Sequence, residues 1–184
     1  MNTTTRATLT FVAGFCDTAT FVHMKGVFSA HVTGNFVLFA VSLAKGFTPQ
    51  DYLKIMTFPF FIGGIFLATL LYARVCERYN KKFGVVALLC WQSLLFTLCS
   101  VALLWGHFRT WDDRSVYALE VCVTLFLVIA LASQNTIHRF VKVPLSTVMT
   151  GTVMNTTAGL TEKYLLKKVI GECKIFCVNV LRMI

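Results

Sequence analysis

The composition of this chain excludes a soluble globular protein. Of its 184 residues, 57% are hydrophobic and only 14% are charged, which is more apolar surface than a water-soluble domain of this length could bury. The net charge of +9 does not indicate nucleic-acid binding, because the basic residues are scattered between apolar runs, as in the loops of membrane proteins. The lipid bilayer is therefore the expected environment, and nucleic acid is not an expected partner.

Six helical segments are predicted along the chain, and their connections are too short for separate domains. A transmembrane helix needs about 20 mostly apolar residues, and the charge-free runs 55–73, 83–106 and 121–137 come closest to this requirement. We predict an all-α, polytopic transmembrane helix bundle of about six helices that forms a single domain over residues 1–184. The predicted segments are residues 7–24, 27–45, 53–75, 83–106, 115–139 and 143–166.

The first segment carries Asp17 in the middle of an apolar stretch. A carboxylate at that depth costs about 2.5–3.5 kcal/mol on insertion scales, so Asp17 should face other helices or a wet cavity and have a partner. On a helical pitch it shares a face with Gly14 and Thr20. Beside a histidine or a threonine hydroxyl, Asp17 could bind a proton or a cation, or hydrogen-bond a polar substrate. The alternative is a structural carboxylate that ties two short helices together.

The second segment contains a polar cluster. His31 and Asn35 share one helical face, and Ser29 and Thr33 share another. His31 alone is more often a satisfied interior or interfacial histidine than a ligand. Gly34 allows a close approach of backbone or substrate, or simply packs a helix crossing.

The third segment has small residues four positions apart, at Gly64 and Ala68. This spacing permits another helix to approach closely. Because the pattern is common, packing within the chain is favoured over a dimer interface.

An ungapped shift of the chain by 117 residues aligns its first part with its last. Asp17 then falls on Gln134. Identical pairs include Ala13 with Ala130, Lys25 with Lys142, Ser29 with Ser146, Thr33 with Thr150 and Gly34 with Gly151. We predict an internal repeat in which the helix pair 7–45 resembles 124–162, as in transporters whose two halves face each other across a pathway. If every intervening segment crosses the membrane, the two copies run in the same direction, whereas an inverted repeat requires one re-entrant segment.

The counterpart of the third segment should lie near residues 170–192. Residues 167–184 instead contain Glu172, Lys174 and Arg182, which make this stretch too short and too charged for a confident span. We expect an atypical charged tail in place of a further helix.

The loop charges do not fix the orientation. With the N-terminus inside and six crossing segments, the most basic loop, between the third and fourth segments, would lie outside while the basic tail lies inside. The four basic residues counted for that loop are Arg74, Arg78, Lys81 and Lys82. The sequence therefore favours neither orientation.

Four short motifs resemble those of the YoaK-like family, small bacterial inner-membrane proteins classed as a domain of unknown function. Residues 11–17, Phe-Val-Ala-Gly-Phe-Cys-Asp, resemble the family's Ala-Gly pair followed by Asp, and residues 31–35, His-Val-Thr-Gly-Asn, resemble its Met-Thr-Gly-Asn segment, with Val32 in place of Met. Residues 130–135 and 150–152 resemble its later Gly-x-Gln-Asn and Thr-Gly-Thr stretches. The resemblance covers residues 7–160. It implies a multi-pass protein of the bacterial inner membrane, shortened at its C-terminus, and names no activity.

A small-solute or ion transporter-like protein is the leading hypothesis for function. Its polar pathway would lie between the repeated helix pairs, because polar groups are costly in lipid. The residues expected to line it are Asp17, His31, Thr33, Gly34, Asn35, Gln134, Asn135, Thr150 and Gly151. The alternative is a structural or partner-binding membrane protein without transport activity, in which these residues only join helices. Assembly as a homo-oligomer is compatible with either hypothesis.

Enzymatic activity is not expected. The chain has no His-Glu-x-x-His or Gly-x-Ser-x-Gly pattern and no nucleophile, base and orienting residue at a familiar spacing. Its seven cysteines form neither a Cys-x-x-Cys pair nor a cluster with histidine, so we expect buried thiols, no metal site and no cofactor.

Overall fold

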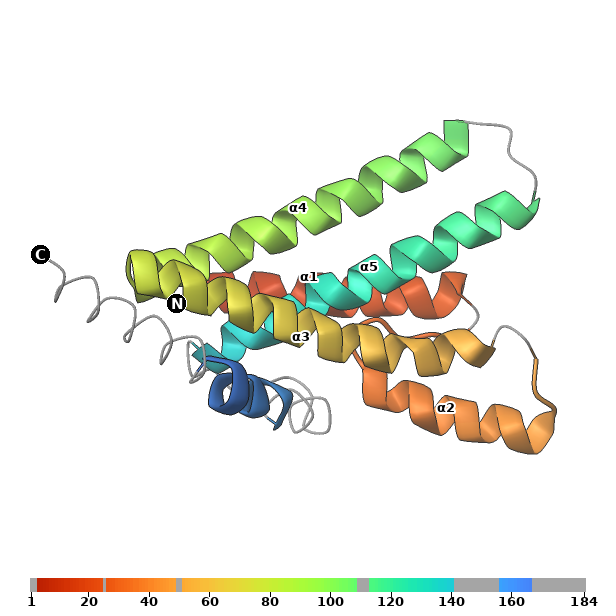
Figure 1. Ribbon diagram of the computed structural model, residues 1–184. Coiled ribbons are helices and arrows are strands. Elements are labelled where there is room, and N and C mark those ends of the chain that lie inside the picture. Colours follow the sequence, from red (N-terminus) through yellow and green to blue (C-terminus); the bar gives the residue numbers. More distant parts are fainter. Residues whose placement is uncertain (1–2, 25, 49–50, 109–112, 141–155, 167–184) are drawn as a thin grey trace, which may run out of the picture.

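The computed structural model describes residues 3–24, 26–48, 51–108, 113–140 and 156–166, and these are almost entirely helical (Figure 1). No strand occurs within these ranges. The helices are α1 (Thr3–His23), α2 (Val32–Lys45), α3 (Tyr52–Arg78), α4 (Lys81–Phe108) and α5 (Asp113–Phe140), and residues 156–160 lead into the π-helical segment η2 (Thr161–Leu166). The sixth predicted segment lies outside the described residues from 143 to 155, as does the predicted tail, 167–184.

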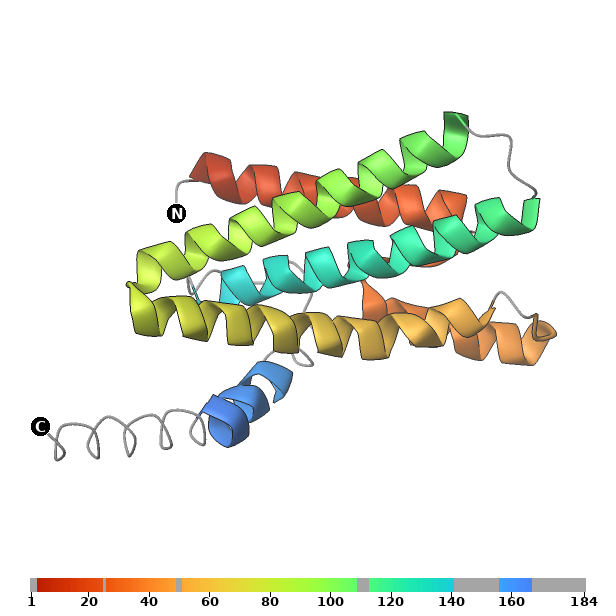
Figure 2. The same cartoon turned by 45° about the horizontal axis from the view of Figure 1, so that its top comes forward.

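Three helices are long and apolar enough to cross a membrane. They comprise 27 residues of α3, 26 of α4 and 27 of α5, with mean hydropathies of 1.9, 2.0 and 2.3. The three charge-free runs therefore form helices that are long and apolar enough to span a membrane, as predicted. Each of these helices runs antiparallel to the one that follows it in the sequence, and α5 packs against both α3 and α4 (Figures 1 and 2).

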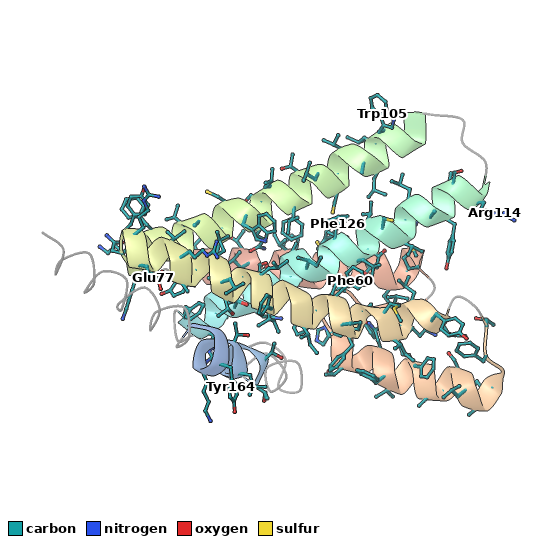
Figure 3. All side chains as sticks on the ribbon, viewed as in Figure 1. Phe60, Glu77, Trp105, Arg114, Phe126 and Tyr164 are labelled. Atoms are coloured by element: carbon teal, nitrogen blue, oxygen red, sulfur yellow. The ribbon has the colours of Figure 1, made fainter. Side chains whose placement is uncertain are left out.

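The outer surface of the bundle is apolar along its length. Phe60, Trp105 and Phe126 are 39%, 61% and 52% exposed, and they project outward from three different helices (Figure 3). Glu77 and Arg114 lie at opposite ends of the bundle instead (Figure 3). An apolar belt with charges at the two ends is the surface that a bilayer stabilises.

The contact between α3 and α5 is close because α3 presents a glycine there. A Cβ atom added to Gly64 would lie 2.8 Å from the Cβ of Ala132 and 3.0 Å from the Cα of Ile129. Phe61 and Ile65, on either side of Gly64, are fully buried in the same core cluster. The small residues of the third segment therefore pack within the chain.

The chain does not form a second full-length helix after α1. Gly26 has a φ of +96°, and residues 26–31 return without helical structure toward the middle of the bundle (Figure 1). The 14-residue helix α2 starts there and runs in the same direction as α1 (Figures 1 and 2). The prediction of a continuous helix over 27–45 was wrong for residues 27–31, because side chains distant in sequence bind their backbone.

Because the chain turns back before α2, the helices α2 to α5 run opposite to the directions that six full crossings would give them. Helices α1 and α5 contain the residues that the 117-residue shift aligns, and they run antiparallel (Figures 1 and 2). The arrangement in which both copies run in the same direction required α2 to run opposite to α1, and it does not. Within the described residues, α1 and α5 therefore do not run in the same direction.

Candidate functional site

Asp17 lies at the point where the broken segment meets α1. It is 5% exposed, and its Oδ1 atom accepts hydrogen bonds from the backbone N–H groups of Ala30 (2.6 Å) and His31 (3.3 Å). Its Oδ2 atom pairs with Nδ1 of His31. These amides immediately precede α2, whose first N–H groups have no partner within the helix. Asp17 therefore caps α2 from a neighbouring helix, where a negative charge also complements the helix dipole.

A polar cavity of about 120 Å³ adjoins this pair, between α1, the residues just before α2, and α5. Its lining combines amide, imidazole and hydroxyl groups with apolar side chains and, among the described residues, contains no Asp, Glu, Lys or Arg. The lining residues are Thr10, Ala13, Gly14, Ala30, His31, Leu131, Gln134, Asn135 and His138. A site with these groups can hold water or a small hydrogen-bonding molecule.

Gln134 connects three helices beside the cavity. Its Nε2 donates to the carbonyl oxygen of Leu9 in α1 (2.7 Å), and its Oε1 accepts from Nε2 of Gln92 in α4 (2.7 Å). Gln134 and Gln92 are each 3% exposed. Buried amides that bond to each other fix the helices that carry them. This series of hydrogen bonds therefore holds α1, α4 and α5 in register.

Asn35 holds the broken segment from its other side. The amide of Asn35 accepts from the Phe28 N–H group and donates to the Phe28 carbonyl oxygen, both at 2.8 Å, and it also donates to Oγ1 of Thr57 in α3 at 2.9 Å. Asn35 is fully buried. A second tie runs from Thr20 to Ser29, whose hydroxyl oxygens lie 3.0 Å apart. The backbone of the non-helical segment is thus satisfied by side chains rather than by water.

The residues predicted to line a pathway divide into three groups. His31, Gln134 and Asn135 lie together on the cavity wall, and Asp17 lies directly behind His31. Asn35 belongs to the helix contacts just described, and Thr33 and Gly34 are half-buried residues of α2 outside the cavity lining. Thr150 and Gly151 lie outside the described residues.

Several site residues were missed by sequence reasoning. Thr10 precedes Gly14 by one helical turn, and His138 follows Gln134 by one turn, so helical spacing from residues already singled out could have found both. Gln92 is a polar side chain within a charge-free span, which is itself a signal for an interhelical contact. Nothing local in the sequence marks Ala30.

A second polar cluster joins α2 to α3. The Asp51 carboxylate accepts hydrogen bonds from Nζ of Lys54 (2.6 Å), Oγ1 of Thr48 (2.6 Å) and Oγ of Ser42 (2.7 Å). These bonds, with that of Lys54 the most important, hold the pKa of Asp51 well below its usual range. The cluster fixes the turn between the two helices and takes no part in the cavity.

Within the described ranges, no three His, Cys, Asp or Glu side chains are grouped as metal ligands.

Near the end of α1, Nε2 of His23 and Oε1 of Glu120 in α5 lie 2.8 Å apart. This pair lies at the rim of a larger, mostly apolar cavity of about 460 Å³ between α1, α4 and α5. The cavity beside Asp17 is therefore the more polar of the two and the better candidate for a solute site.

Comparison with known proteins gives a family that covers most of the chain. Residues 6–180 match the family described as "Protein of unknown function (DUF1275)". No curated protein and no solved structure matches the chain.

Proposed function

Because the chain belongs to the DUF1275 family, whose function is unknown, we propose a function from the site itself. The protein is a multi-pass transporter-like protein of the bacterial inner membrane, and it moves a small solute or an ion through the cavity beside Asp17 and His31. The single observation that carries this proposal is a cavity with polar groups in its wall, which lies between α1, the non-helical residues just before α2, and the membrane-length helix α5.

The physical reason is the cost of irregular backbone and polar groups in a membrane. Non-helical backbone is tolerated at membrane depth only where protein buries it or where it lines a water-filled cavity. Residues 26–31 are such a segment, and Ala30 and His31 lie in the cavity wall. Broken helices of this kind form the substrate sites of many secondary transporters.

The proposal includes the internal repeat as an inverted repeat. The aligned residues Asp17 and Gln134 lie on the antiparallel helices α1 and α5; Gln134 lines the cavity, and Asp17 bonds to His31, which lines it as well. In inverted repeats, the two copies meet at the binding site. This placement supports a pathway between the copies.

Proteoliposomes containing the purified protein test the proposal. Gly14 lines the cavity, and a Cβ atom added there would meet no atom within 4 Å, so Gly14→Val should reduce the cavity. Gly63 of α3 also has open space and lies outside the cavity lining, so Gly63→Val is the matched control. We expect the protein to accelerate the entry of at least one solute from a panel of ions and small polar molecules. Gly14→Val should reduce this rate and Gly63→Val should not.

Permeation equal to that of protein-free liposomes for every solute, with the protein folded, would overturn the proposal. The second candidate function, a structural or partner-binding membrane protein, is favoured by one observation: Asp17, Gln134 and Asn35 each join helices through closed hydrogen bonds. It predicts that both glycine variants leave permeation at the liposome background.

A further inference from the structure

We propose that the cavity selects a small uncharged solute that carries both a hydrogen-bond donor and an acceptor, held between Nε2 of His31 and the amide of Asn135. Asp17 acts as the positioning residue that fixes the imidazole of His31. This inference rests on the proposed function and names the class of solute that the same cavity would take.

The pairing with Asp17 determines what His31 presents to the cavity. The carboxylate of Asp17 already accepts two backbone N–H groups through Oδ1, so its Oδ2 atom acts as an acceptor toward Nδ1 of His31. A neutral imidazole that donates from Nδ1 has its lone pair on Nε2. His31 lines the cavity, and its side chain is 51% exposed. The ring thus offers the cavity an acceptor, which fits a solute with an N–H or O–H group.

Asn135 supplies the complementary groups from α5. It is half-buried on the cavity wall, and within the described part of the chain its side chain has no hydrogen-bond partner. Its neighbour Gln134 has both ends of its amide engaged, by Leu9 and by Gln92. Asn135 can therefore accept from a solute and donate to it, while Gln134 holds the wall in place.

The absence of fixed charge in the lining sets the class of solute. No Asp, Glu, Lys or Arg is among the described residues that line the cavity, and the Asp17 carboxylate is already bonded to groups of the protein. A charged solute would lose its hydration without gaining a counter-charge, and this is costly in an apolar surrounding. An uncharged molecule of a few heavy atoms, such as urea, acetamide or glycerol, fits the volume of about 120 Å³.

Solute entry into proteoliposomes tests the class directly. We expect urea, acetamide or glycerol to enter faster than in protein-free liposomes, and sodium formate and guanidinium chloride to enter at the background rate. Asn135→Ala and His31→Ala should each lower the accelerated rate by about tenfold, the effect of removing one hydrogen-bonding partner in a dry site. Asn80→Ala, in the turn between α3 and α4, is the control for Asn135→Ala and should leave the rate unchanged.

Imidazole ¹⁵N NMR of the full-length protein tests the positioning residue independently of transport. We expect His31 to carry its proton on Nδ1 in the unaltered protein and to lose this preference in Asp17→Asn, whereas the His23 signals stay the same. A structural role of Asp17 alone would not shift the tautomer selectively.

The outcomes separate the two proposals. Entry of the ions but not of the uncharged probes overturns the solute class and leaves transport standing. Background entry of every probe overturns transport and the solute class together. An unchanged His31 tautomer in folded Asp17→Asn overturns the role given to Asp17.

Discussion

Replacement by alanine should affect stability differently at Asn35 and at Asn135, although both residues are asparagines. Asn35→Ala removes an amide that bonds three groups and leaves Phe28 backbone atoms unpaired inside the bundle. We expect this variant to lose about 1–3 kcal/mol of stability, the cost of stranding buried polar groups. Asn135→Ala removes no bond within the described residues and should melt close to the unaltered protein. Thermal unfolding in detergent compares the two, and equal melting temperatures would contradict the prediction.

The hydrogen bonds of the Asp51 carboxylate should make the stability of the folded protein depend on pH. Its folded-state pKa is depressed, chiefly by the hydrogen bond from Lys54, so the stabilisation is present above the ordinary aspartate pKa of about 3.9 and is lost as the pH falls below it. Asp51→Asn lacks this contribution at every pH. We expect the variant to melt below the unaltered protein at pH 7 and the gap to narrow below about pH 4. A gap that is constant from pH 7 to pH 3 would show that the Asp51 charge contributes nothing.

At the scale of the helix, Gly64 and Gly63 differ although they are adjacent on α3. Gly64→Ala brings a methyl group to within 2.8 Å of Ala132 and 3.0 Å of the Ile129 backbone, so α3 and α5 must separate. Overpacking of this kind costs about 1–3 kcal/mol. Gly63→Ala meets open space and should be neutral or slightly stabilising, because alanine is the better helix former. Melting curves of both variants in one detergent test this difference, and the absence of any loss for Gly64→Ala would refute the close contact.

The long helices could be predicted from the sequence, but the broken one could not. A charge-free run of transmembrane length has one stable solution in lipid, a helix that satisfies its own backbone. Residues 26–31 are compatible with a helix by composition, but they are not helical, because side chains of other residues bind the N–H groups of Phe28, Ala30 and His31. Asp17 binds Ala30 from α1, and Asn35 binds Phe28 from α2. Such a choice depends on tertiary contacts that no local pattern encodes.

The candidate site was predictable in part for the same reason. Asp17 and Gln134 were identifiable because a strongly polar side chain in an apolar helix requires a partner. Their common position beside one cavity depends on the direction of α5 relative to α1, which follows from the return of the chain before α2. The pairing of Asp17 with His31 likewise arises from that return.

At the scale of the whole molecule, the helix directions resolve the charge distribution that loop counting leaves ambiguous. Helix α1 begins at the end of the bundle that contains the α3–α4 turn and the end of α5 (Figures 1 and 2). Among the described residues of α1 to α5, the basic residues near this end are Arg6, Arg74, Arg78, Lys81, Lys82 and Arg139, and those near the other end are Lys45, Lys54 and Arg114. Because Lys54 is also paired with Asp51, the excess of positive charge lies at the first end.

The positive-inside rule then predicts that the start of α1 and the α3–α4 turn both face the cytoplasm. Epitope tags at the N-terminus and after Asn80 should both become accessible to an antibody only after the membrane is permeabilised, because they lie on the cytoplasmic side. A tag after Phe47 should be accessible from outside. A chain in which α2 crosses fully would place the N-terminal tag and the Asn80 tag on opposite sides. That result would remove the re-entrant segment, because only a chain that turns back before α2 brings these two positions to one face.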